Sequence, residues 1–386
     1  MNESAAAPVL LAVSVVPVWP VENGFTLRAL ALLSELSRRW DVVLATPMAG
    51  APPAALARLR HVEPLPITTR WAHLPANHDP RRLVGIVRQL VGRWRPSAAL
   101  FFHGAEHVAF GLPELPPAVS DHVDCLALAA AESLRRRRRL RNRLAGIRDL
   151  WQAARFERAL VRRMTYTIAA GARDAAALRR LGQRRTVTVI PNGVDVTPTS
   201  CWSARTREPT VLFTGILDYG PNTDAACFLA RHVWPRVRDV RPDARLRIAG
   251  RRPPAAVRDL ADAPFVTVHP DVDDMRTMLQ QAWLAVAPMR RGSGVKNKVL
   301  EAWGSGRAVV MTPHAVNGLP IPPGHEALIA ASASELAERI VTLLEDPPHL
   351  KCLGETAHAF ARAHLSWSGM SARVSELLAM ASAAPK

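Results

Sequence analysis

The sequence is poor in cysteine, tyrosine, phenylalanine and lysine, and each shortage narrows what the protein can be. Its four cysteines stand far apart and form no CxxC pair. This spacing indicates neither a zinc site nor a disulfide framework, and it fits a reducing cytoplasm. Two tyrosines and nine phenylalanines leave few rings on which bases could stack, which argues against a protein that binds single-stranded nucleic acid.

The sequence also lacks long hydrophobic runs. The apolar stretch at residues 8–20 has no Lys or Arg before it and is too short to cross a bilayer. We therefore expect a first buried strand there rather than a signal peptide. No other stretch approaches the ~18 uncharged apolar residues of a membrane-spanning helix. We expect a cytoplasmic protein that is soluble or peripheral to the inner face of the membrane.

Charge of one sign dominates, with 50 Lys and Arg against 33 Asp and Glu and a formal net charge of +17. Nucleic acid, an acidic membrane surface, a phosphorylated substrate or an arginine-favouring genome would each account for this excess. The densest basic segment, residues 134–163, holds five consecutive arginines at 135–139 and is predicted to be a helix with an arginine-rich face. That face is either solvated or in contact with anionic lipid headgroups or an acidic acceptor.

Apolar runs alternate with helical patterns along the chain, as in a parallel, doubly wound sheet. The predicted strands lie at residues 9–16, 41–47, 97–104, 118–124, 166–171, 186–193, 210–215, 244–250, 265–270, 284–289 and 308–313. We expect an α/β fold with two Rossmann-like domains facing a central cleft. The domains would span residues 1–195 and 210–365, with a linker at 196–209 and a C-terminal helix at 366–386 that packs back on the first domain.

The segment APMRRGSGVKNKVLEAWGSGRAVVMTP, residues 287–313, is predicted to form a strand, a glycine-bearing basic loop, a helix from near residue 295, and a second strand. A glycine loop at a helix N-terminus presents unpaired backbone N–H groups to a phosphate. Lys296 and Lys298 supply two of the only four lysines in the chain, and Glu301 lies one turn further on. Phosphates at one end and a ribose diol at the other describe a nucleotide, whereas the plainer interpretation is an ordinary βαβ turn.

With these elements in order, the sequence resembles the retaining GT-B glycosyltransferases of glycosyltransferase family 4, also called glycosyl transferases group 1. The resemblance covers nearly the whole chain and rests on the following segments: ENGFTLRALALLSELSRRWDVVLAT, VIPNGVD, VLFTGILDYGPNTDAACFL, LRIAGRRP, VHPDVDDM and KVLEAWGSGRAVVMT. It implies a GT-B fold and transfer of a hexosyl group from a nucleoside diphosphate sugar.

The resemblance also implies roles for individual residues. Glu301 would bind the donor ribose, while Lys298 and the backbone of Ser293 and Gly294 would face the diphosphate. Val272 lies where the family reads the nucleobase, and Gly24 lies in the turn that closes on the phosphates from the first domain. His103 resembles a histidine that contacts the transferred sugar, so His103 and Lys298 are the expected catalytic residues.

The sequence departs from the family pattern at three places. Ser293 stands where the first glutamate of Glu-x7-Glu is usual, so the sugar contacts of that glutamate are lost or supplied by backbone. The loop GILDYGPN has no basic residue where relatives often have Arg and Lys; Arg251 or Lys296 would substitute for them at the donor site. The opening loop has a single glycine, Gly24, where many relatives have two.

The implied mechanism retains the anomeric configuration and lets the diphosphate help to deprotonate the acceptor, so neither a carboxylate base nor a metal or other cofactor is expected. Asp121 and Asp124 are either acidic catalytic residues or, in the favoured interpretation, residues that fix loops through bonds from side chain to backbone. The acceptor is an unknown hydroxyl compound: a saccharide, a lipid-linked sugar or a secondary metabolite. The alternatives are a nucleotide-sugar 2-epimerase on the same fold, or a non-catalytic relative that binds a membrane surface or nucleic acid.

Overall fold

The computed structural model describes residues 7–67, 80–102, 104–136, 140–182, 186–197, 202, 205–292 and 294–383. The chain divides into two compact units. The first comprises residues 1–192 together with the C-terminal segment 367–386, and the second comprises residues 193–366. The sequence placed the end of the first domain at residue 195 and a linker at 196–209, whereas the contacts assign that linker to the second unit.

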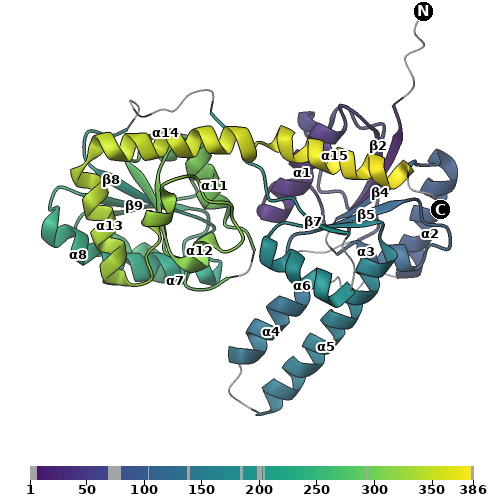
Figure 1. Ribbon diagram of the computed structural model, residues 1–386, viewed down its shortest axis with the longest axis horizontal. Helices are drawn as coiled ribbons and strands as arrows, with labels where there is room; N and C mark the ends of the chain where they lie inside the picture. Colours follow the sequence, from purple (N-terminus) through teal and green to yellow (C-terminus); the bar gives the residue numbers. More distant parts are fainter. Residues whose placement is uncertain are drawn as a thin grey trace, which may run out of the picture. The chain divides into compact units, whose positions relative to one another are not determined.

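The first unit is built on a seven-stranded parallel sheet (Figure 1), in the order β3-β2-β1-β4-β5-β6-β7. Its strands are β1 (Val9–Val13), β2 (Asp41–Thr46), β3 (His61–Pro64), β4 (Ala98–Phe102), β5 (Ala118–His122), β6 (Tyr166–Ala169) and β7 (Val187–Val189). Its helices are α1 (Gly24–Leu36), α2 (Pro80–Trp94), α3 (Glu106–Phe110), α4 (Leu126–Arg136), α5 (Leu140–Arg163), α6 (Ala172–Gly182) and α15 (Trp367–Ala383). Six of these strands fall on apolar runs that the sequence singles out; β3 was not predicted.

Successive residues of β1 point to opposite faces of this sheet, and each face has its own core. Leu10 and Ala12 pack with α1 and α15, whereas Leu11 and Val13 pack with α2, α3 and the end of α5. The C-terminal helix α15 contributes four buried apolar residues to the first of these cores, and its Ser375 hydroxyl accepts a hydrogen bond of 2.9 Å from the indole N–H of Trp40. The last helix of the chain thus completes the first unit.

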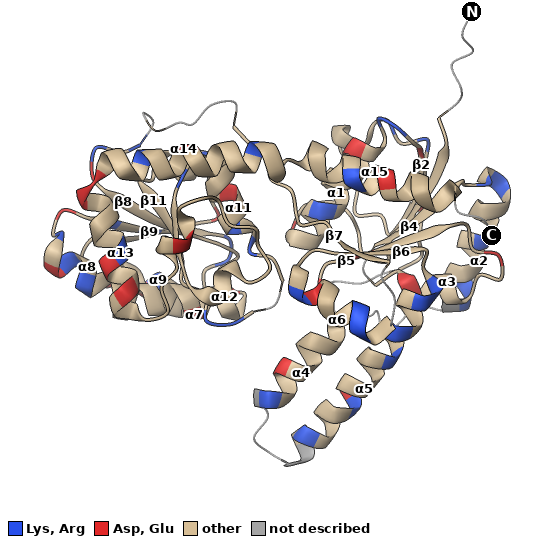
Figure 2. Ribbon diagram, viewed as in Figure 1, with Lys and Arg blue, Asp and Glu red and all other residues tan. Residues whose placement is uncertain are grey.

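Residues 134–163 do not form the single basic helix that the sequence predicts. Helix α4 ends at Arg136 and α5 begins at Leu140, and the two helices pack against each other as a hairpin (Figure 2). A continuous helix through residues 135–139 would stack like charges one turn apart, which is unfavourable, whereas the hairpin lets both helices bury apolar side chains. Residues 137–139 lie outside the described chain.

The second unit contains a five-stranded parallel sheet in the order β10-β9-β8-β11-β12. Its strands are β8 (Thr210–Thr214), β9 (Arg245–Gly250), β10 (Val266–Pro270), β11 (Leu284–Ala287) and β12 (Val309–Met311). Its helices are α7 (Gly220–Phe228), α8 (Trp234–Val240), α9 (Ala255–Arg258), α10 (Met275–Gln281), α11 (Asn297–Gly304), α12 (Pro313–Val316), α13 (Ala333–Glu345) and α14 (Pro347–His364). All five strands fall on predicted runs, and one continuous apolar core joins them to the helices.

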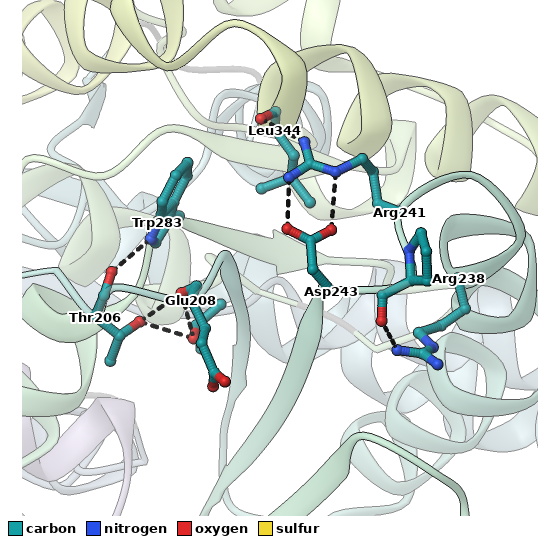
Figure 3. Close-up of polar contacts among 9 residues, drawn as sticks. Thr206, Glu208, Arg238, Arg241, Asp243, Trp283 and Leu344 are labelled. Atoms are coloured by element: carbon teal, nitrogen blue, oxygen red, sulfur yellow. Dashed lines mark hydrogen bonds and ion pairs between the residues drawn. The ribbon is translucent and has the colours of Figure 1, made fainter.

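Polar contacts at the amino ends of these strands fix the segment that enters the second sheet (Figure 3). The indole N–H of Trp283 donates to the carbonyl of Thr206 at 2.8 Å. Arg241 makes a two-point contact with Asp243 at 3.0 and 2.9 Å and donates to the carbonyl of Leu344 at 2.7 Å, which ties this edge to the end of α13. These hydrogen bonds hold together the edge of the second sheet where its strands begin. The predicted site lies at the opposite edge, where the strands end.

Candidate functional site

The carboxyl ends of β8 and β9 approach each other backbone to backbone. Gly250 has φ +155, and a Cβ atom there would lie 1.7 Å from the carbonyl oxygen of Gly215. A Cβ atom on Gly215 would in turn lie 2.9 Å from the ammonium of Lys298. Only glycine fits at Gly250, where a Cβ atom would meet backbone, and the absence of a Cβ atom at Gly215 leaves room for the Lys298 ammonium beside the strand ends.

Lys298 belongs to the first turn of α11 and is held over the end of β8. Its ammonium donates to the side-chain oxygen of Asn222 at 2.7 Å and lies 4.2 Å from the centre of the Phe213 ring. Burial lowers the pKa of Lys298 to about 7, with a further lowering from Lys296 and an opposing effect of Glu301. The lysine therefore loses much of its charge near neutral pH unless an anion binds beside it.

Glu301 follows Lys298 by three residues, so the two side chains lie on the same side of α11. Burial raises the pKa of the half-buried Glu301 carboxyl, as does the nearby Asp195, while Lys298 lowers it. Among the described residues, no hydrogen bond or ion pair is recorded for this carboxylate. A carboxylate without such a partner can accept a hydrogen bond from a hydroxyl group, such as those of a ribose.

The loop between β11 and α11 is shaped by Lys296. The buried ammonium of Lys296 donates to the carbonyls of Gly292 and Gly294 at 3.0 and 2.6 Å. An imidazole nitrogen of His314 also lies 2.7 Å from the Gly292 carbonyl oxygen. Both glycines have positive φ, +105 and +73, which suits residues without a Cβ atom. Lys296 thus braces the loop, and its predicted contact with a donor stays a prediction; Ser293 lies outside the described residues.

The basic residues before this loop are tied to α7. Arg290 makes a two-point contact with Asp224 at 3.1 and 2.7 Å, and Arg291 lies 3.6 Å from the same carboxylate. These arginines, which sequence reasoning did not assign to the site, bring positive charge to the carboxyl edge near the loop GILDYGPN. The sequence could have indicated them, since Arg290 and Arg291 stand immediately before Gly292 in the glycine-bearing segment.

Two further predicted donor residues follow neighbouring strands of the same edge. Arg251 comes directly after β9, has an exposed side chain, and accepts a hydrogen bond of 2.8 Å from Leu217 through its carbonyl. Val272 follows β10 in the turn before α10 and packs half-buried against the core. The second unit thus brings Arg251, Val272, Gly294, Lys296, Lys298 and Glu301 to the carboxyl side of one sheet.

The remaining predicted residues belong to the first unit. Gly24 begins α1, whose N-terminus is capped reciprocally: the side chain of Asn23 accepts from the backbone of Thr26, and the hydroxyl of Thr26 accepts from the backbone of Asn23. His103 lies outside the described residues. Gly104, which follows it, has φ +92 and stands at the carboxyl end of β4.

A buried polar cluster next to Gly104 was missed by sequence reasoning. The Glu106 carboxylate accepts the N–H of Gly104 at 2.6 Å and lies 3.3 Å from the His122 ring. His107 bonds the Gly104 carbonyl at 2.7 Å. Burial raises the pKa of Glu106 to about 8, with smaller contributions from Asp121 and Glu157. Glu106 and His107 therefore hold the backbone at the end of β4 from both sides.

Asp121 has a different role from the one expected. The Arg28 guanidinium of α1 donates to the Asp121 carboxylate at 2.7, 2.8 and 3.1 Å, so the aspartate pairs with a side chain rather than with loop backbone. Arg28 also donates to the carbonyl of Pro191 and the side chain of Asn192, both at 3.0 Å. The pair is fully buried and ties α1, β5 and the end of the first unit together.

Within the described part of the chain, no group of three or more His, Cys, Asp or Glu side chains could hold a metal ion. The same residues contain no helix long and apolar enough to cross a membrane.

Comparison with known proteins agrees with this arrangement. Residues 208–346, within the second unit, match the family model described as Glycosyl transferases group 1. No curated protein sequence matches the chain.

Solved structures of similar fold cover nearly the whole chain. Sucrose-phosphate synthase from Thermosynechococcus elongatus aligns over 97% of this chain and 98% of its own, with a TM-score of 0.73 and 16% identity. HepE of Anabaena, in complex with UDP and glucose, aligns over 97% and 100% with a TM-score of 0.67 and 15% identity. WaaG, a glycosyltransferase involved in lipopolysaccharide biosynthesis, aligns over 96% and 99% with a TM-score of 0.66 and 16% identity.

The fold is that of the GT-B glycosyltransferases, with two Rossmann-like units. The family match places a group 1 glycosyltransferase domain in the second unit, and the chain is accordingly a glycosyltransferase.

Proposed function

We propose that the protein transfers a hexosyl group from a nucleoside diphosphate sugar to a hydroxyl acceptor, with retention of anomeric configuration. The observation that carries this proposal is the pair Lys298 and Glu301 on one side of α11. Lys298 offers an ammonium whose pKa would rise beside a bound anion. Glu301 offers a carboxylate that can accept hydrogen bonds from ribose hydroxyls. We expect the diphosphate to lie beside Lys298 and the ribose beside Glu301, three residues further along the helix.

The chemistry requires stabilisation of the charge that develops on the departing diphosphate. The N-terminus of α11 presents backbone N–H groups and the positive end of the helix dipole. Lys298 adds a cation that is held in place by Asn222 and by the Phe213 ring. No proton transfer from a protein group is needed at this step, and the diphosphate itself helps to deprotonate the attacking hydroxyl. We expect no metal requirement.

The donor base and sugar are open, and UDP-glucose is the first candidate because Anabaena HepE has been crystallised with it. The acceptor is a saccharide, a lipid-linked sugar or a secondary metabolite. In the first unit, His103 and Gly24 are proposed to contact the sugar and the phosphates. Ser293 would leave the sugar contacts of the usual glutamate to backbone groups. A cytoplasmic location also stays a proposal.

Donor hydrolysis tests this function without knowledge of the acceptor. The protein is incubated with UDP-, GDP-, ADP- and dTDP-sugars, and the release of nucleoside diphosphate and free sugar is followed. Slow hydrolysis of one donor, lost in Lys298→Ala and kept in the exposed control Lys351→Ala, supports the proposal. Appearance of an epimer would instead indicate a 2-epimerase, and neither turnover nor binding of any donor would indicate a non-catalytic relative.

A further inference from the structure

Helix α5 presents an apolar stripe to solvent. Leu144, Ile147 and Trp151 are 61%, 53% and 60% exposed. Their spacing of three and four residues places them on one side of the helix, which a soluble surface normally fills with polar residues. They lie in the half of α5 nearer to Leu140, the half of the helix that projects beyond the sheet of the first unit (Figure 1).

The exposed charges along α5 are positive. Among the described side chains of α5, all six exposed ionisable groups are arginines: Arg143, Arg148, Arg155, Arg158, Arg162 and Arg163. The helix has two carboxylates, of which Asp149 is half-buried and Glu157 is buried. The Arg155 guanidinium lies 5.3 Å from the centre of the Trp151 ring. Over residues 134–163 the sequence holds twelve arginines against these two carboxylates.

The helix that carries the stripe is anchored at its base. The buried Glu157 carboxylate accepts the N–H groups of Leu126 and Ala127 at 2.5 and 3.1 Å, which caps the start of α4. Asp174 of α6 accepts the N–H of Cys125 at 2.8 Å. These bonds fix where α4 starts against α5 and α6, so the apolar stripe is presented by a held hairpin rather than by a free helix.

We propose that this face of α5, defined by Leu144, Ile147 and Trp151 with the exposed arginines Arg143, Arg148, Arg155 and Arg158, docks the protein on the surface of a bilayer that contains anionic phospholipid. Apolar side chains, one of them a tryptophan, would enter the boundary between headgroups and acyl chains, and the arginines would pair with lipid phosphates. The proposal is independent of the sugar transfer proposed above.

The charge and the apolar residues of this face favour an anionic bilayer over two other partners, a second copy of the chain and a nucleic acid. A second copy of the same face would set arginines against arginines, which is unfavourable. A nucleic acid would satisfy the arginines but would leave the apolar stripe without a partner, because phosphate backbones offer no apolar surface. A bilayer with anionic headgroups satisfies both features at once.

Vesicle co-sedimentation tests the proposal. The full chain is mixed at low salt with vesicles of equal parts phosphatidylglycerol and phosphatidylcholine, and with vesicles of phosphatidylcholine alone. Three variants are compared: the stripe variant L144S/I147S/W151S, the charge variant R148Q/R155Q/R158Q, and the matched control R231Q/R236Q/R258Q, which removes three exposed arginines from the second unit. Circular dichroism and a thermal melt verify that each variant is folded.

Wild-type protein is expected to bind the anionic vesicles and to release them as salt rises. Both variants of α5 should bind far more weakly, the charge variant by about a hundredfold at ~1 kcal/mol per arginine, while the control variant behaves as wild type. Absence of wild-type binding at low salt, an equal loss in the control variant, or unchanged binding of the stripe variant would overturn the proposal. So would a dimer in sedimentation velocity that the stripe variant abolishes.

Discussion

The pH dependence of donor binding follows from the state of Lys298. Burial holds its pKa at about 7 in the free protein, so at pH 8 about a tenth of the molecules carry a charged ammonium there. Only the charged form can pair with a diphosphate. Binding should therefore take up a proton, and affinity should fall roughly tenfold per pH unit above 7 until the raised pKa of the bound state is reached.

The measurement is the dissociation constant of UDP or GDP, whichever binds more tightly, by isothermal titration calorimetry from pH 6 to pH 9. Titration in buffers of different ionisation enthalpy reports the proton uptake directly. Lys298→Met should bind weakly at every pH and show no such fall, and the exposed control Lys351→Met should follow the wild type. A wild-type affinity that stays constant between pH 7 and pH 9 would refute this account of Lys298.

Three further results are expected. Glu301→Gln should keep the fold and weaken donor binding by about 1.5–3 kcal/mol, measured by calorimetry beside the exposed control Glu338→Gln. Burial raises the pKa of Glu106 from 4.5 to about 8, so its protonated side chain contributes fully to stability below pH 4.5, and this contribution is lost as the pH rises to 8. Denaturant titrations should show the corresponding decline in the free energy of unfolding in the wild type and not in Glu106→Gln. Asp121→Ala should cost about 3–5 kcal/mol in thermal or denaturant unfolding because it leaves the Arg28 charge buried and unpaired, and Arg28→Met/Asp121→Leu should recover most of that loss.

Most of the sheet architecture could be predicted because buried parallel strands are continuous apolar runs. All eleven predicted runs contain a strand. The exception, β3 at His61–Pro64, is an edge strand whose four residues are half-buried or exposed, so its sequence carries no apolar run. Edge strands are specified by their neighbour in the sheet, which composition does not reveal.

The hairpin of α4 and α5 shows a different limit. The arginine run at 135–139 suggested one basic helix, since arginine is a good helix former. The chain ends α4 at Arg136 and begins α5 at Leu140 because packing of the two helices against each other outweighs local propensity. The exposed stripe on α5 follows from this packing and was not visible in the sequence.

The part of the candidate donor site around α11 could be placed from the sequence because its residues lie close together along the chain, and their binding of a donor stays a prediction. Lys298 and Glu301 share one helix, and the glycine loop directly precedes it. Arg28 and Asp121 stand 93 residues apart and meet only when α1 packs beside β5, so their pairing required the fold. Likewise, Glu106 begins α3 and His122 ends β5, and no local motif connects the two residues.

The central claim is that α11 binds the diphosphate through Lys298 and the ribose through Glu301, and a ligand-by-variant cycle tests it most directly. Dissociation constants are measured for the nucleoside diphosphate and the matching monophosphate with wild type, Lys298→Ala and Glu301→Gln. The account predicts that Lys298→Ala weakens the diphosphate far more than the monophosphate, while Glu301→Gln weakens both equally. Equal losses for both ligands in Lys298→Ala, or no loss in either variant, would contradict it.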